Sequence, residues 1–136
     1  MSDAATKPFS AAVDASEGAM RLSVYVVTSF PTNGFGPLEE VLPKHREYLH
    51  GLEKRGVLIM AGPLSDEDPG NWSGGGMLAY LAKDEAAARD LADADPMHAS
   101  GARTYTLRRW LVNEGSLTVR VKLSDQSAAI IPAETD

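Results

Sequence analysis

The order of the patterned segments predicts an α+β fold, in which one antiparallel sheet carries two helices on one of its faces. Three observations support this prediction. Runs rich in β-branched and aromatic residues alternate with two amphipathic stretches in the order β-α-β-β-α-β. Glycine and proline stand at the junctions between them. The 136 residues suffice for one domain with a modest core. This order is that of the split βαβ, or ferredoxin-like, arrangement, here with an added C-terminal strand.

The first half of the predicted domain is a strand, a helix and a second strand. Residues 21–30 have the composition and length of a strand, and turn chemistry follows them. The helix is expected from Pro43 to Arg55, with an earlier turn at 38–42, because proline suits a first helical turn and Gly56 suits the position just past the end. Residues 57–64 predict a short buried strand.

The second half begins with a loop, after which residues 76–82 predict the third strand. Asp84 is expected to start a second helix, because a carboxylate at the N-cap accepts from the free amides of the first turn. Pro96 stops or bends that helix. Residues 102–112 predict the fourth strand. After a turn, residues 116–123 alternate between apolar and polar side chains, which predicts a hairpin carrying a fifth strand with one solvated face.

Both ends of the chain lack a clear pattern. Residues 1–20 are rich in alanine, serine and aspartate without a helical or strand period, and we interpret them as a flexible N-terminal arm. Residues 125–136 are interpreted as a loose tail, so the folded domain is expected to span residues 21–124. No apolar stretch has the length of a signal peptide or a membrane span, and the lack of cysteine fits a cytoplasmic protein.

Composition excludes several classes of function. Thirteen Lys and Arg against nineteen Asp and Glu residues give a formal net charge of −6, so a nucleic-acid backbone is repelled on average. The absence of cysteine removes disulfides, thiolate metal sites and cysteine nucleophiles. Nucleic acid is therefore not expected as a partner.

A second copy of the chain is expected as a partner. A sheet with both helices on one face has a second face that needs a cover if its side chains are apolar. Five large side chains on the strands are more than two short helices are expected to cover, which favours a homodimer; they are Tyr25, Val27, Leu78, Tyr80 and Trp110.

Helix geometry separates one histidine from the other two. At 100° per residue, His45 falls within the apolar stripe of the first helix, whereas His50 falls on its charged side. An imidazole on a stripe that faces the core needs a hydrogen-bond partner. His45 is therefore either a satisfied core histidine or a catalytic group.

The second helix offers a partner for it. Asp95 lies on the apolar side of that helix, where acids are rare unless they are paired. Asp95 either caps the turn before Pro96 or meets His45, because the two helices lie side by side in the predicted fold. An aspartate that accepts from one imidazole nitrogen fixes the tautomer and raises the basicity of the other nitrogen. Such a pair suits proton transfer better than acyl transfer, since no nucleophile accompanies it.

Other motifs carry weaker signals. The glycine run at 73–76 lacks the lysine and helix of a phosphate loop, and the acidic loop at 66–77 lacks the last glutamate of a calcium loop. The histidines lack zinc spacing, although a metal at His45 and Asp95, or at His98, stays open as a minor alternative. No dinucleotide or flavin fingerprint is present, so neither an organic cofactor nor a metal is predicted.

Three further residues are candidates for binding a substrate. Trp72 stands in the polar glycine loop, where it either covers a pocket or packs on its neighbours. Arg46 follows His45 and either holds an anionic substrate or is simply solvated. His98 places a second imidazole close to the sequence of Asp95 and Pro96.

With these residues, the chain resembles the YCII-related family over about residues 21–123. The resemblance rests on His45, on the glycine loop, and on the segments at 58–64 (LIMAGPL), 92–101 (ADADPMHASG) and 105–110 (YTLRRW). It implies a dimeric α+β barrel and an active-site pair of helix histidine and D-P aspartate, which map to His45 and Asp95. Where the family usually has an aromatic residue after D-P, this chain has Met97.

The resemblance also bears on function. One relative is a dehydrochlorinase of a chlorinated hydroxyhydroquinone, and related barrels include muconolactone isomerases and small monooxygenases. It implies proton transfer on a small cyclic or aromatic compound. Our leading hypothesis is a small cytoplasmic homodimeric lyase or isomerase, with His45 as general acid or base and Asp95 orienting it. The alternatives are a non-catalytic module that binds or senses a small ligand, and a purely structural His–Asp hydrogen bond.

Overall fold

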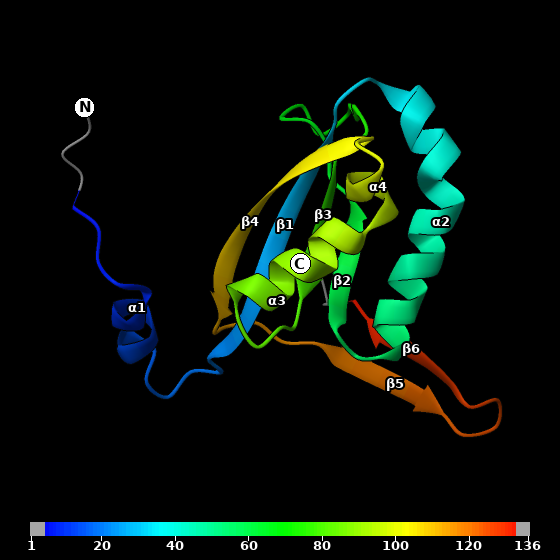
Figure 1. Cartoon of the computed structure of the whole chain (residues 1–136). Coiled ribbons are helices and arrows are strands. Elements are labelled where there is room, and N and C mark those ends of the chain that lie inside the picture. The colour runs from blue at the N-terminus through cyan, green and yellow to red at the C-terminus, as the bar shows by residue number, and fades with distance from the viewer. Residues whose placement is uncertain (1–4, 133–136) are drawn as a thin grey trace. The chain divides into compact units, whose positions relative to one another are not determined.

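The computed structural model describes residues 5–132, which fall into two compact units. One unit is Leu22–Val112, and the other joins the described residues that precede and follow it. The larger unit contains the following elements in chain order (Figure 1): β1 (Leu22–Pro31), α2 (Phe35–Lys54), β2 (Leu58–Pro63), β3 (Gly76–Tyr80), α3 (Glu85–Ala94), α4 (Pro96–Ala99) and β4 (Arg103–Val112). None of the helices described combines the length and apolarity needed to span a membrane.

The strands of this unit form one four-stranded sheet in the order β2-β3-β1-β4. Every neighbouring pair is antiparallel, and Val27 of β1 lies opposite Leu78 of β3 and Leu107 of β4. The strand order and the two crossover helices are those of the ferredoxin-like arrangement. The predicted α+β class is therefore confirmed.

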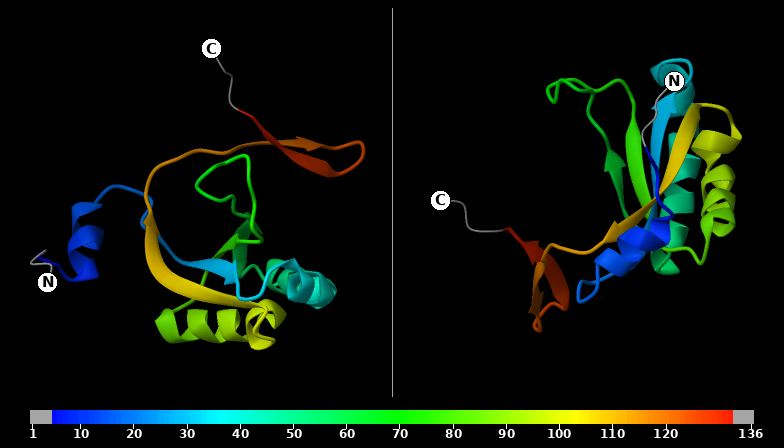
Figure 2. Two further views of the ribbon diagram at one scale, coloured as in Figure 1. Left: turned by 90° about the horizontal axis from the view of Figure 1, so that it is seen from above. Right: turned by 90° about the vertical axis from the view of Figure 1, so that its left-hand side faces the viewer.

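The main core lies between the sheet and two of the helices. Val27, Leu78 and Tyr80 project from the sheet and are buried against Leu52 of α2 and Ala92 of α3. Helices α2 and α3 lie on the same side of the sheet (Figure 2, right). The fully buried alanines Ala88 and Ala92 on α3 allow this helix to approach the sheet closely.

This packing corrects one sequence-based expectation. Tyr25, Val27, Leu78 and Tyr80 are all buried within the described chain, whereas Trp110 keeps 47% of its surface exposed. The large apolar residues of the strands point mainly toward the helices, because the alternation of β1 and β3 places them there. The four buried side chains therefore give no reason to expect a second copy of the chain. Of the five residues, only Trp110 still favours a homodimer.

Helix α2 is longer than the sequence predicted. It begins at Phe35 and continues through Pro43, which was expected to lie in the first turn. An internal proline removes one helical hydrogen bond, a local cost. Burial of Leu38 against Met97 and Ala102, in a second core cluster, offsets that cost and extends the helix toward its N-terminus.

The smaller unit also differs from the sequence-based expectation. A short helix, α1 (Phe9–Ala15), forms in the segment in which no regular structure was expected, and none of its residues is buried. The predicted fifth strand is present as β5 (Thr118–Lys122), but it pairs with β6 (Ser127–Ile131) in a separate two-stranded sheet rather than in a hairpin with β4. The part of the expected tail that lies at 133–136 is outside the described residues.

Turn chemistry explains the second pairing. The side chain of Asp125 accepts hydrogen bonds from the backbone N–H and the hydroxyl of Ser127, at 3.0 and 2.7 Å. Such an Asp-centred turn reverses the chain directly after β5 and presents β6 to it. Asp125 and Ser127 lie within residues 125–136, which the sequence led us to interpret as a loose tail, so this turn was not predicted.

The glycine loop before β3 supports a stability prediction. Gly74 has φ +98°, and a Cβ there would lie 2.7 Å from Cδ1 of Leu38. We expect Gly74→Ala to lower the free energy of unfolding by about 1–3 kcal/mol, through backbone strain and overpacking. Urea unfolding measures the change, with Gly70→Ala in the same loop as the control. Equal stability of the two variants would contradict the prediction.

Candidate active site

Two buried polar side chains meet where α2 passes the junction of α3 and α4. His45, 8% exposed, and Asp95, 0% exposed, are joined by a hydrogen bond of 2.7 Å between Nδ1 and Oδ1. The residues are 50 positions apart in the chain. The apolar stripes of the two helices predicted this contact, and the structure shows it.

The local sequence explains why Asp95 points inward. Helix α3 ends at Ala94, and Pro96 opens α4 because its missing N–H costs nothing in a first turn. Asp95 between them has an extended backbone, and its Oδ1 accepts from the amide of Met97 at 2.9 Å. From the sequence, capping of the turn and pairing with His45 were alternative roles for Asp95. In the structure, its Oδ1 performs both.

The hydrogen bond dictates the state of the imidazole. A carboxylate oxygen can only accept, so Nδ1 of His45 carries the hydrogen. In the neutral ring, Nε2 then holds the lone pair and is the basic nitrogen. When Nε2 takes a proton, the carboxylate lies next to the positive ring and stabilises it. The pair is therefore able to accept and return a proton.

A cavity of about 240 Å³ adjoins this pair. Its walls are mostly apolar, and its ionisable lining groups are basic; the lining residues are Leu42, His45, Arg46, Leu49, Ala61, Gly62, Pro63, Trp72, Gly76, Met77, Leu78 and Arg103. The cavity thus lies between α2, the neighbouring strands β2 and β3, the loop that carries Trp72 and the start of β4. A space of this size suits a ligand of about one ring, since drug-sized ligands occupy roughly 300–1,000 Å³.

Two of the three candidate binding residues line this cavity. Arg46 does so from the exposed side of α2. Trp72 lines it while also packing on a neighbour, because its ring lies 5.3 Å from that of Phe35 and its Nε1 donates to the Gly75 carbonyl at 2.7 Å. The covering and packing interpretations of Trp72 are therefore compatible.

His98 is not among the residues that line the cavity. Its Nδ1 donates to the carbonyl of Ala92 at 2.7 Å, and its Nε2 lies 2.7 Å from the hydroxyl of the fully buried Ser29. Its ring also contacts that of Tyr105, with centroids 4.6 Å apart. Both nitrogens serve to join α3 to the sheet, so the structure does not bring His98 to the ligand space.

Burial makes His98 a source of pH-dependent stability. Desolvation lowers the pKa of His98 below its ordinary value of 6.5, although the Ala92 carbonyl and Asp95 oppose the shift. The folded state therefore favours the neutral ring, and its contribution is complete above pH 6.5 and lost as the pH falls through the lowered pKa. We expect the wild-type chain to lose more stability than His98→Gln between neutral and mildly acidic pH. Urea unfolding across that range measures the difference, and parallel curves would contradict it.

Arg103 is a cavity residue that sequence reasoning missed. It was treated only as the start of a strand, because nothing near it in the sequence marks a site. In the structure, its Nε and Nη2 both donate to the carbonyl of Gly74, at 3.1 and 2.7 Å. That partner lies 29 positions away in the chain, so no local signal indicates it.

Tyr80 is fully buried and does not line the His45 cavity. Burial, and then the charge of Asp95, raise the pKa of Tyr80 far above its ordinary range, so the phenol stays protonated. Its hydroxyl and Oδ2 of Asp95 are buried without a hydrogen-bond partner among the described residues.

Within residues 5–132, the His, Asp and Glu side chains form no group of three that could hold a metal ion.

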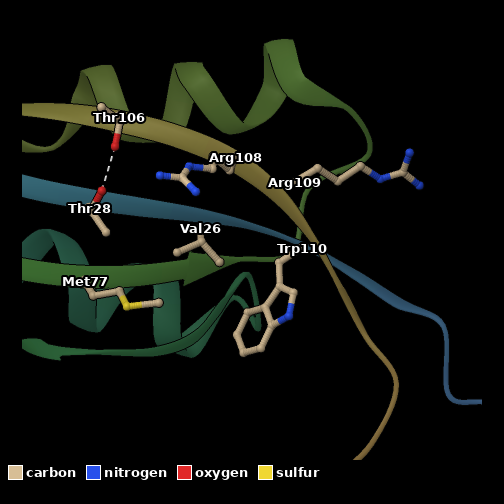
Figure 3. Close-up of a pocket in the computed structure, with 7 residues that line it drawn as sticks. All are labelled: Val26, Thr28, Met77, Thr106, Arg108, Arg109 and Trp110. Atoms are coloured by element: carbon tan, nitrogen blue, oxygen red, sulfur yellow. Dashed lines mark hydrogen bonds between the residues drawn. The ribbon is translucent and has the colours of Figure 1, made fainter. Parts of the chain in front are cut away.

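A second depression, of about 340 Å³, lies on the sheet face that the helices leave open. The hydroxyls of Thr28 and Thr106 are 2.6 Å apart there, beside Val26 and Trp110, and Arg108 projects over the same face while Arg109 turns away (Figure 3). It shares only Met77 with the lining of the His45 cavity. The two depressions are therefore distinct features of the sheet.

Comparison with known proteins identifies a family and a solved structure to which the chain is similar. A family model described as the YCII-related domain matches residues 23–111. The solved structure is that of 5-chloro-2-hydroxyhydroquinone dehydrochlorinase from Burkholderia phenoliruptrix AC1100 in complex with 2,5-dihydroxybenzoquinone. That match has 17% sequence identity and a TM-score of 0.48, and covers 64% of this chain and 92% of that chain. No curated protein matches the chain.

Proposed function

The chain belongs to the YCII-related family, and we propose that it is an enzyme in which His45 and Asp95 transfer a proton on a small cyclic or aromatic compound. The observation that carries this proposal is the 2.7 Å bond between the two side chains, made in the wall of a cavity. Burial of Asp95 keeps the carboxylate against Nδ1, and the cavity gives a small molecule access to the histidine.

The composition of the cavity favours proton transfer over covalent catalysis. None of the side chains that line it carries a hydroxyl, a thiol or an amine, so the cavity offers no ordinary nucleophile for acyl transfer. A histidine that accepts a proton from one atom of a substrate and returns it to another catalyses an isomerisation. If the electron pair of the broken C–H bond instead forms a double bond and expels a leaving group such as chloride, the same proton removal completes an elimination. The proposed reaction is therefore that of an isomerase or a lyase of the dehydrochlorinase type.

Deuterium exchange tests this proposal even before the substrate is identified. The purified chain is incubated in D2O with a panel of small lactones, hydroquinones and chlorinated phenols, and proton NMR follows exchange and product formation. We expect at least one compound to exchange or react faster with the wild type than with His45→Gln. If compounds bind, as shown by melting shifts, and none reacts faster than with the variant, the chain is a ligand-binding module instead.

We also propose that the enzyme acts in the cytoplasm as a homodimer. The cysteine-free composition supports the compartment. The half-exposed Trp110 on the open sheet face supports the pairing, because a large aromatic residue at a depression is typical of an interface centre.

Sedimentation equilibrium checks the homodimer. We expect the wild-type chain to have twice the mass of one chain, and Trp110→Glu to shift it toward one chain because a buried carboxylate would have no partner. Ala86→Glu, at an exposed position of α3 on the other side of the sheet, adds the same charge and is the control. A monomeric wild type would contradict the proposal.

A further inference from the structure

The ionisable side chains that line the His45 cavity are all basic. His45, Arg46 and Arg103 line it, and no aspartate or glutamate does so. The chain as a whole carries a net charge of −6, so this local excess runs against its average. A basic lining inside mainly apolar walls attracts an anion with an apolar body.

Arg103 is held in position for such a ligand. Its Nε and Nη2 both contact the Gly74 carbonyl, which occupies one edge of the guanidinium. Nη1 makes no hydrogen bond with the described residues, and it lies so close to Gly76 that a Cβ there would be 3.2 Å away. The absence of a side chain at Gly76 therefore leaves room for the second edge of the guanidinium.

The charge of Arg103 also has no carboxylate partner within salt-bridge distance among the described residues. Burial lowers the pKa of Arg103, and the charge of Asp95 opposes this shift. A guanidinium stays protonated even so, because its ordinary pKa is far above neutral pH. A partly desolvated, unpaired guanidinium gains more from a bound carboxylate than one that is solvated or already paired.

We infer that the cavity takes a small cyclic or aromatic carboxylate, whose carboxylate group binds the Nη1 edge of Arg103. The ring then lies against the apolar wall formed by Leu42, Leu49 and Leu78, beside the imidazole of His45. This inference deepens the proposed function, because it names the class of substrate for the same site. Arg103 is a binding residue in it and takes no part in moving the proton.

Benzoate and benzamide test this inference, because they have the same ring and similar size but differ in charge. Calorimetric titration at neutral pH gives the affinity of each probe for the wild type. We expect benzoate to bind about tenfold or more tightly than benzamide, the preference that one charge-assisted bidentate contact supplies. Arg103→Gln should reduce that preference to about one. Arg103→Lys should keep part of it, since lysine retains the charge without the fork.

Matched variants separate the contact from general effects. Arg89→Gln removes a guanidinium on α3 that pairs with Glu85, away from the cavity, and should keep the wild-type preference. Gly76→Ala keeps every charge but crowds Nη1, and should weaken benzoate binding more than benzamide binding. This variant serves if Arg103→Gln does not fold, which circular dichroism checks.

Two results would overturn the inference: a wild type that does not prefer benzoate, or a folded Arg103→Gln that keeps the preference. Neither result depends on turnover. If the preference is present and no proton exchange occurs with any compound, only the proposed reaction fails. If exchange occurs without an anion preference, only the substrate class fails.

Discussion

Replacing Asp95 by alanine is expected to lower the free energy of unfolding by about 3 kcal/mol, because one buried oxygen supports two other groups. Without Oδ1, the amide of Met97 at the start of α4 and Nδ1 of His45 both lose their hydrogen-bond partner. Neither group is well placed to bond water instead, since Met97 is 1% exposed and His45 is nearly buried. Urea unfolding, followed by circular dichroism, measures the loss.

Two further variants show which property of Asp95 matters for stability. Asp95→Asn keeps an oxygen that accepts from both groups, so its cost is expected to be about 1 kcal/mol. Asp90→Ala, at an exposed position of α3, removes the same charge and should change stability by less than about 0.5 kcal/mol. An Asp95→Ala protein as stable as Asp90→Ala would show that the buried contacts contribute little.

His45→Gln is expected to lower the rate of the proposed reaction by about 10²–10⁴-fold, the contribution typical of a general acid or base. A glutamine amide also carries N–H groups that can donate to Asp95, so the fold is expected to be retained, and circular dichroism checks this. It has no nitrogen that accepts a proton near neutral pH, so the proton transfer is lost. The measurement is kcat for the compound that the deuterium-exchange panel identifies.

The third histidine provides the control for this experiment. His50 lies on the same helix but is exposed, and it does not line the His45 cavity. His50→Gln should therefore keep the wild-type rate. If His45→Gln keeps it too, the bond to Asp95 is purely structural and the proposed mechanism is wrong.

The fold was largely predictable because its signals are local. The composition and length of residues 21–30 indicated β1, and Asp84 indicated the start of α3, where it accepts from the amide of Ala87 at 2.8 Å. Each of these signals depends on neighbouring residues only. The predicted bounds of an element were wrong where a contact with a distant residue outweighed a local cost. Helix α2 is the example, because burial of Leu38 offsets the cost of Pro43 inside the helix, so α2 begins eight residues before Pro43.

The candidate site was predictable in part, for the same reason. His45 and Asp95 each contradicted the apolar stripe of their own helix, and two such exceptions on adjacent helices predicted a contact. Arg103 contradicts nothing in its own strand. The binding role that we propose for it depends on a carbonyl 29 residues away and on the space left by Gly76, and the sequence shows neither of these contacts.

The sequence by itself therefore determined the order of the four strands and two crossover helices within Leu22–Val112, the family and the identity of one buried polar pair, because periodicity and residue type carry that information along the chain. Only the tertiary structure decided how many large residues the helices cover, where the C-terminal strands pair, and which side chains surround the cavity. Those properties arise from contacts between distant segments. Their free energies are set by packing and burial, which depend on where the chain brings each residue in space.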